Sequence, residues 1–144
     1  MPLDTDIFAL IDRVNHLPVL NGNSVRQIFQ SPLQQVADTG NPYIKILTAD
    51  VDEASAVQHL ELRIPVESAP SSQALLILTL RAGRGVPIDE VRRRYGVAAR
   101  VEMPRAEAPT GTPTYEIYEF PWGRLNFGYR TIDNQLREVI FDKK

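Results

Sequence analysis

The chain repeats one order of elements, a short helix followed by three or four strand-like runs. The first occurrence spans residues 24–81 and the second spans residues 86–142. Polar links that contain proline, glycine, asparagine or aspartate separate the apolar runs, and these residue types favour turns. The repeat is one of architecture and not of sequence identity. It predicts an α+β fold in a single domain of residues 1–144, made of tandem short-helix plus antiparallel β-sheet units with an extra N-terminal helix.

Three helices are expected from apolar spacing and terminal signals. Residues 4–17 carry apolar side chains at helical spacing and form the extra N-terminal helix. Ser24 can cap a second helix, which ends before Pro32. In the second unit, Pro87 suits the first turn of a third helix and Gly96 suits its end.

Seven strands are expected, and residues 34–42 are expected to form a loop. The strands are residues 43–49, 57–66, 74–81, 99–103, 115–120, 124–130 and 136–142. Residues 75–80 are apolar at odd-numbered and at even-numbered positions alike, except for Thr79. This pattern predicts a central strand that is covered on both faces. The two units are expected either to merge into one sheet or to sit as two packed sheets, with the helices on one face.

Composition excludes several functional classes. The 144 residues are 43% hydrophobic and 24% charged, which is typical of a globular chain and not of a disordered one. A net charge of −2 argues against nucleic acid as the main partner. The absence of cysteine rules out disulfides, cysteine-ligated metals and thiol catalysis. The longest apolar run is too short for a membrane-spanning helix, so no membrane span is expected.

The sequence lacks the motifs of common catalytic and metal sites. His16 and His59 are isolated, and neither an HExxH pattern nor a Gly-x-Ser-x-Gly elbow is present. The acidic pair Asp89 and Glu90 falls in a solvated first helix turn, whereas catalytic carboxylates need burial or a like-charged neighbour. We therefore expect no cofactor, no metal and no enzymatic activity.

The start of the chain leaves two locations open. The first residues lack the basic and apolar segments of a signal peptide. A periplasmic location is expected if Met1 replaces a removed signal peptide, and a cytoplasmic location is the alternative. A cysteine-free chain suits both compartments.

Two segments are candidates for binding another protein. The proline-rich residues 104–113 should project as a loop, with Arg105, Glu107 and Thr110 available to a partner, unless the loop is a passive connector. The second candidate combines Trp122 with nearby basic residues. Trp122 occupies a turn beside Arg124, and such a pair is typical of a binding hot spot, although core packing of Trp122 is equally compatible.

A run of three arginines in the third helix adds a positive patch. Arg92 and Arg93 belong to this run and suit an acidic protein surface, whereas a solvated helix face is the plainer interpretation. The sequence does not indicate that these arginines, Trp122 and the loop lie on one face.

Residues 85–96, GVPIDEVRRRYG, resemble the opening of a repeat in the β-lactamase-inhibitor-protein-like and small outer-membrane lipoprotein group. In that group a glycine-led turn, an acidic helix start and a closing glycine precede a small antiparallel sheet. Residues 115–118, 125–127 and 136–141 look like the strands of that sheet. The resemblance covers the second unit only, and without cysteines no disulfide or interface residue can be carried across.

The resemblance implies an exported bacterial protein that binds other proteins. Small periplasmic immunity proteins share this size and α+β style, as an analogy of fold. We therefore expect an inhibitor or immunity protein that neutralises a partner enzyme or toxin without catalysis, as a monomer or homodimer. The alternative is an envelope assembly factor, or a module that holds a small apolar ligand between sheet and helices.

Overall fold

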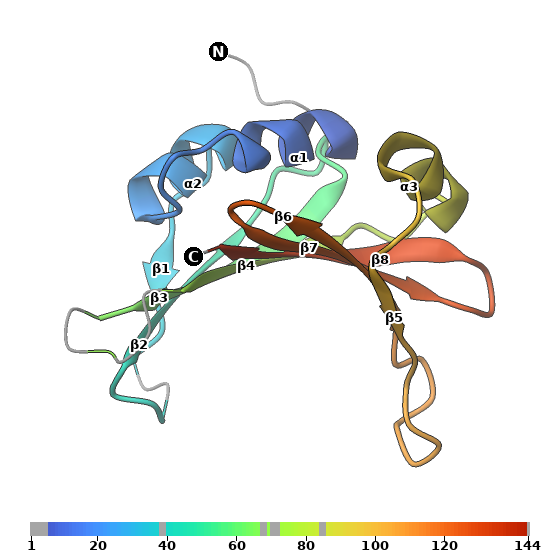
Figure 1. The fold of residues 1–144 in the computed structure, drawn as a ribbon. Coiled ribbons are helices and arrows are strands. Elements are labelled where there is room, and N and C mark those ends of the chain that lie inside the picture. Colours follow the sequence, from blue (N-terminus) through green and yellow to red (C-terminus); the bar gives the residue numbers. More distant parts are fainter. Residues whose placement is uncertain (1–5, 38–39, 67–68, 70–72, 84–85, 144) are drawn as a thin grey trace.

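Two four-stranded units meet at their last strands and form one eight-stranded antiparallel sheet (Figure 1). The computed structural model describes residues 6–37, 40–66, 69, 73–83 and 86–143. The elements of the first part are α1 (Ile7–Asn15), α2 (Gly22–Phe29), β1 (Gln34–Gln35), β2 (Ile44–Asp50), β3 (Val57–Pro65) and β4 (Ala74–Leu80). Those of the second are α3 (Ile88–Tyr95), β5 (Arg100–Glu102), β6 (Thr114–Phe120), β7 (Gly123–Arg130) and β8 (Gln135–Lys143). The predicted α+β class is confirmed.

The strand order is β1-β2-β3-β4-β8-β7-β6-β5, so each unit contributes one half of the sheet. The units join where β4 pairs with β8, and Ile77 lies opposite Ile140 in this pairing. All three helices lie on the same face of the sheet (Figure 1). Helix α2 lies above the β1 end, α3 above the β5 end, and α1 between them. The guanidinium of Arg94 in α3 lies 4.1 Å from the centre of the Phe8 ring in α1.

Local side-chain chemistry explains where the helices begin and end. The Asp6 carboxylate accepts a hydrogen bond from the Phe8 amide at 3.0 Å and caps α1. The cap of α2 is Asn21 and not Ser24, which is the third helical residue and completes a reciprocal capping box with Asn21. Pro87 is the N-cap of α3 and lies just outside the helix, while Gly96 ends it with a φ of 82°.

Two strand predictions were wrong. The segment expected as a loop over residues 34–42 contains β1, in which Gln34 and Gln35 pair with β2. Strand β4 is central, as expected, but helices cover only one of its faces in the described part of the chain. Leu76 and Leu78 are buried toward the helices, whereas Leu75 and Ile77 remain partly exposed on the other face.

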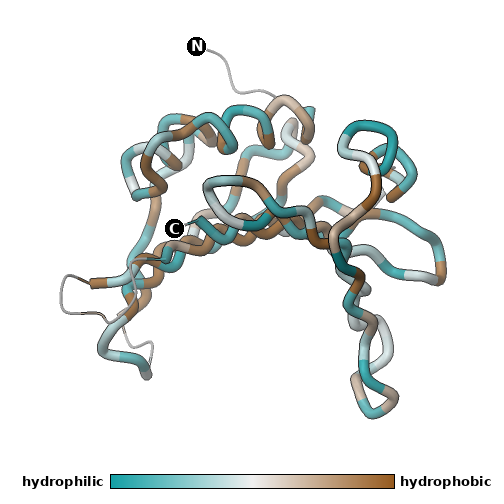
Figure 2. The backbone as a smooth tube through the Cα atoms, viewed as in Figure 1, coloured by the Kyte–Doolittle hydropathy of each residue, from teal (hydrophilic) through white to brown (hydrophobic). Residues whose placement is uncertain are grey.

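The core lies between the helices and the sheet. Apolar residues alternate along the strands and recur on the inner sides of the helices (Figure 2). Phe29, Leu62, Leu78, Phe127 and Phe141 are among its largest fully buried side chains.

Two residues that the sequence predictions use lie outside the described residues. They are Met1, on which the predicted location depends, and Gly85, with which the family resemblance begins.

Candidate protein-binding face

The sheet face opposite the helices, here called the open face, carries at its centre a row of isoleucines that one asparagine interrupts. Ile77, Ile140, Asn126 and Ile117 lie opposite one another on β4, β8, β7 and β6. Leu75, two residues before Ile77, belongs to the same face because side chains alternate along a strand. The centre of the open face is therefore largely apolar, and Leu75, Ile77 and Ile140 are half-buried there, whereas Ile117 is buried.

Charged residues occupy the rows on either side of this centre. One row continues from Leu75 to Asp142, Arg124 and Glu119, and the register of four adjacent strands aligns them. The other row includes Glu138, which lies opposite Gly128. The open face thus combines an apolar centre with a charged border.

A shallow hollow of about 200 Å³ lies where Asn126 separates two isoleucines. The Asn126 Oδ1 atom is buried and makes no hydrogen bond with the described residues. The hollow is lined by Arg100, Glu102, Tyr115, Ile117, Arg124, Asn126 and Ile140.

The polar side chains around the hollow differ in whether they already form hydrogen bonds or ion pairs with other described residues. The Arg124 side chain is exposed and forms no hydrogen bond or ion pair within the described part of the chain. Arg100 pairs with Glu102 at 3.1 Å, and both side chains are more than half exposed. The Tyr115 hydroxyl donates a hydrogen bond to Glu138, and burial together with this bond raises the pKa of Tyr115. Tyr115 therefore remains a neutral phenol.

The loop of residues 103–113 extends beside the open face. It connects β5 to β6 and hangs on the side of the sheet away from the helices (Figure 1). Within it, the Ala108 amide donates to the Arg105 carbonyl and the Thr112 amide donates to the Pro109 carbonyl, so the loop contains two turns. Arg105, Glu107 and Thr110 are exposed on it. These three predicted residues and Arg124 lie on the same side of the sheet.

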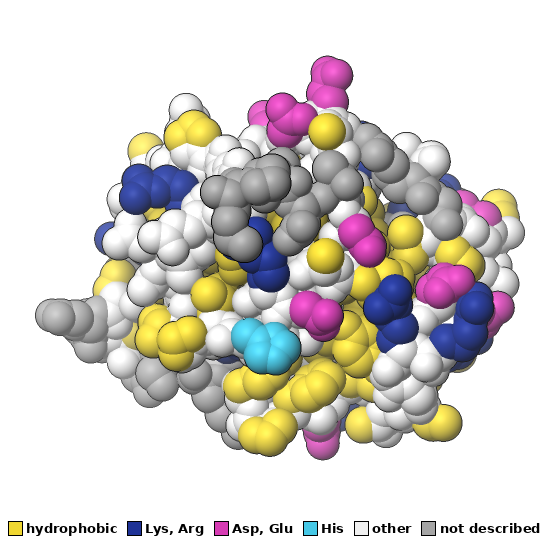
Figure 3. Space-filling view, turned by 90° about the horizontal axis from the view of Figure 1, so that it is seen from above, with side chains coloured by type: hydrophobic (Ala, Val, Ile, Leu, Met, Phe, Trp, Pro, Cys, Tyr) yellow, Lys and Arg dark blue, Asp and Glu magenta, His cyan; other side chains and the backbone are white. Residues whose placement is uncertain are grey.

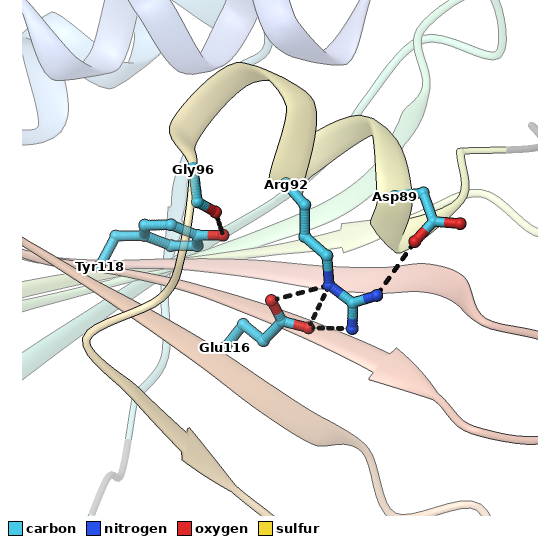
Figure 4. A network of polar contacts seen from close by, with 5 residues as sticks. All are labelled: Asp89, Arg92, Gly96, Glu116 and Tyr118. Carbon is cyan, nitrogen blue, oxygen red and sulfur yellow. Dashed lines mark hydrogen bonds and ion pairs between the residues drawn. The ribbon is translucent and has the colours of Figure 1, made fainter.

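The other predicted arginines lie on the helix side. The guanidinium of Arg92 binds the nearly buried Glu116 carboxylate, with a shortest distance of 2.6 Å, and Asp89 at 3.0 Å (Figure 4). The hydrogen bond to Glu116 raises the pKa of Arg92 above its usual value. Arg93 pairs with Glu90 at 2.5 Å within the helix. The ion pair between Arg92 and Glu116 therefore links α3 to β6.

Trp122 also lies on the helix side and packs against the core. Its ring stacks on Phe120 at 5.2 Å with an interplanar angle of 3°, and it lies 6.3 Å from the Phe141 ring. The Lys143 ammonium lies 4.9 Å from the centre of the Trp122 ring. Trp122 and Arg124 therefore do not form one surface, although they are two residues apart.

Seen from above, the helix side carries acidic and basic side chains among hydrophobic ones, several of which gather beside a histidine (Figure 3). At the end of α1, His16 Nδ1 lies 2.7 Å from the Asp12 carbonyl oxygen, whereas His59 Nδ1 lies 2.9 Å from Asp50 Oδ1 on the open face. In the part of the chain that is described, no three ligating side chains gather as a metal site would require.

Residues 100, 102, 115, 117, 126 and 140 line the hollow and were absent from the predicted site. The alternation of Asn126 with Leu125 and Phe127 indicated that Asn126 faces away from the core. Which strands lie beside it follows from the register of β6, β7 and β8, and no residue pattern specifies this register.

Comparisons with known proteins found no matching family model, no similar curated protein and no similar solved structure. None of the helices in the described ranges has the length and apolar character needed to cross a membrane.

Proposed function

We propose that this chain is a non-catalytic protein-binding protein that holds its partner on the open face. The observation that carries the proposal is the hollow over Asn126, which lies within an apolar centre bordered by charges. Protein interfaces have this anatomy, an apolar core with a polar rim. A sheet face that only meets water normally carries polar residues at alternate positions, whereas Ile77 and Ile140 lie side by side here.

The chemistry of the hollow indicates what the partner presents. Its walls from Ile117 and Ile140, on either side of Asn126, suit one apolar or aromatic side chain. The Arg124 side chain at the rim has no hydrogen-bond or ion-pair partner among the residues that the structure describes, and it suits a carboxylate, which binds guanidinium in a bidentate manner. We therefore expect the partner to insert an apolar anchor next to an acidic residue.

The loop of residues 103–113 supplies a second contact. Proline at positions 104, 109 and 113 restricts its backbone, so less conformational entropy is lost when a partner orders it. Arg105 and Glu107 offer charges of both signs on this loop. The partner would then bind the flat face and the projecting loop at once.

The finer proposal, an inhibitor or immunity protein that neutralises an enzyme or toxin, rests on the family resemblance of residues 85–142. The packing also favours protein binding over an apolar ligand held beneath the helices. That layer is filled by buried side chains from both sides, including Leu10, Phe29 and Phe127.

Site-specific photo-crosslinking in the native host tests which face binds a partner. A photoreactive amino acid is placed at Glu119 or Glu107 on the open-face side, and at Gln27 or Arg93 on the helix side as matched exposed controls. The proposal predicts one and the same cross-linked protein from positions 119 and 107 and none from positions 27 and 93. Cross-linking confined to the helix side would refute it.

A further inference from the structure

Strand β5 is an edge of the sheet, and its outer side is not paired within the described chain. Arg100, Val101 and Glu102 are all exposed, and Val101 is 52% exposed although it lies within a strand. Val97 and Met103 on either side of β5 are also exposed, at 96% and 74%. An unpaired edge with exposed apolar residues is a template for pairing with another strand.

The sequence of this edge is complementary to itself. If two copies pair antiparallel about a two-fold axis at Val101, Arg100 of each copy lies opposite Glu102 of the other. Opposite charges in directly opposed positions stabilise an antiparallel pair. The two valines face each other across the axis on the helix side, because Val101 lies opposite Glu116 in the β5–β6 pairing.

The neighbouring two-fold registers lack this complementarity. An axis at Arg100 would place two arginines opposite each other, and an axis at Glu102 would place two glutamates opposite each other. Like charges in these positions are destabilising. The charge order of β5 therefore selects one register out of the three.

We propose that the protein forms a homodimer through β5, with Arg100 and Glu102 pairing across a two-fold axis at Val101. The interface is isologous, as closed dimers require. Pro104 has no amide hydrogen, so the pairing ends soon after Met103. Such a short pairing buries less than the roughly 800 Å² per partner of a standard interface, and the dimer therefore depends on protein concentration.

Dimerisation through β5 would join two open faces into one continuous surface. The loops of residues 103–113 follow directly after β5, so both loops would lie near the two-fold axis. Arg100 and Glu102 form one rim of the hollow over Asn126. The ion pairs across the two-fold axis would therefore restrict the positions of these two side chains. The dimer does not depend on the proposed partner.

Sedimentation equilibrium with charge variants tests the dimer. We expect the wild-type mass to rise from 16.2 kDa toward twice that value as concentration increases. Arg100→Glu and Glu102→Arg should each weaken self-association at least tenfold, because each places like charges opposite each other. An equimolar mixture of the two variants, or one chain with both changes, should regain the dimer. The proposal would be overturned by a wild-type chain that stays monomeric at millimolar concentration. It would also be overturned if both single-charge variants dimerised as strongly as the wild type.

A single introduced cysteine tests the register. The chain has no cysteine, so Val101→Cys provides one thiol per molecule. Opposed residues of an antiparallel pair have Cα atoms about 4.5–5.5 Å apart, which falls within the range of a disulfide. Val101→Cys should form a disulfide-linked dimer under mild oxidation, whereas Ile132→Cys, at a position 86% exposed in another turn, should not. Equal cross-linking of both variants would refute the register.

Discussion

The Lys143 ammonium lies 2.9 Å from the Val14 carbonyl oxygen, so the end of the last strand caps the first helix. It also donates to the Leu17 carbonyl at 2.9 Å, and burial lowers the pKa of Lys143. A cation at a helix C-terminus satisfies carbonyls that lack intrahelical partners.

Lys143→Met should destabilise the fold, since it removes the hydrogen bonds to the end of α1. We expect a loss of about 1–3 kcal/mol in the free energy of unfolding, the cost of leaving buried polar groups without partners. Urea denaturation measures the loss. Lys45→Met, the same change at an exposed position of β2, is the matched control and should shift the midpoint little. Equal effects of the two substitutions would show that the Lys143 cap is unimportant.

Arg92→Met should destabilise the protein more than Arg93→Met. The first change leaves the Glu116 carboxylate, whose side chain is 4% exposed, without its ion-pair partner. Because Arg92 itself is about half exposed, we expect a loss of about 1–3 kcal/mol. The Arg93–Glu90 pair is exposed and should contribute less than about 1 kcal/mol. Chemical denaturation of both variants decides whether Arg92 fastens α3 to the sheet.

Trp122→Ala should lower the free energy of unfolding of the protein. The substitution removes the stack on Phe120 and the contact with Lys143, at a site that is partly buried. We expect a loss of about 2–4 kcal/mol, below the usual cost for a fully buried tryptophan. Trp122→Phe should recover most of the loss because it keeps an aromatic ring. If the thermal unfolding of Trp122→Ala is the same as that of the wild type, Trp122 does not stabilise the core. It would then lie in a turn without a structural role or face a partner.

Stability should fall above pH 10 because several tyrosines are buried as neutral phenols. Burial raises the pKa of Tyr95 to about 12, from an ordinary value of 10.0. The unfolded chain therefore loses this proton first, and stability is full below pH 10 and decreases between about pH 10 and 12. One such group contributes up to about 1.4 kcal/mol per pH unit.

Tyr95→Phe should make the loss of stability shallower over this range. Urea denaturation at several pH values measures it, with Tyr43→Phe, at a position 49% exposed, as the control. A Tyr95→Phe chain that loses stability as steeply as the wild type would contradict the assignment.

Sequence periodicity predicted seven of the eight strands because their apolar residues alternate or run continuously. Strand β1 has no such signal, since Gln34 and Gln35 are exposed and pair with β2 only through the backbone. The run around Ile77 predicted a central strand correctly but suggested two covered faces. Apolarity alone does not distinguish burial beneath helices from exposure on an open face.

The candidate site was predictable only in part. A proline-rich loop and a nearby arginine were evident, and the loop and Arg124 lie on the same side of the sheet. Trp122 was grouped with Arg124 because the two are neighbours in sequence. The turn directs Trp122 toward Phe120 and the core, and the alternation of β7 directs Arg124 to the open face.

The most direct test of the open-face account is titration calorimetry with the protein that cross-links through position 119. Arg124→Glu is compared with Arg93→Glu, so that the same reversal is made on an exposed arginine of each face. The account predicts that Arg124→Glu weakens binding on the order of 10- to 100-fold, while Arg93→Glu binds like the wild type. Wild-type affinity for Arg124→Glu together with weakened binding by Arg93→Glu would contradict it.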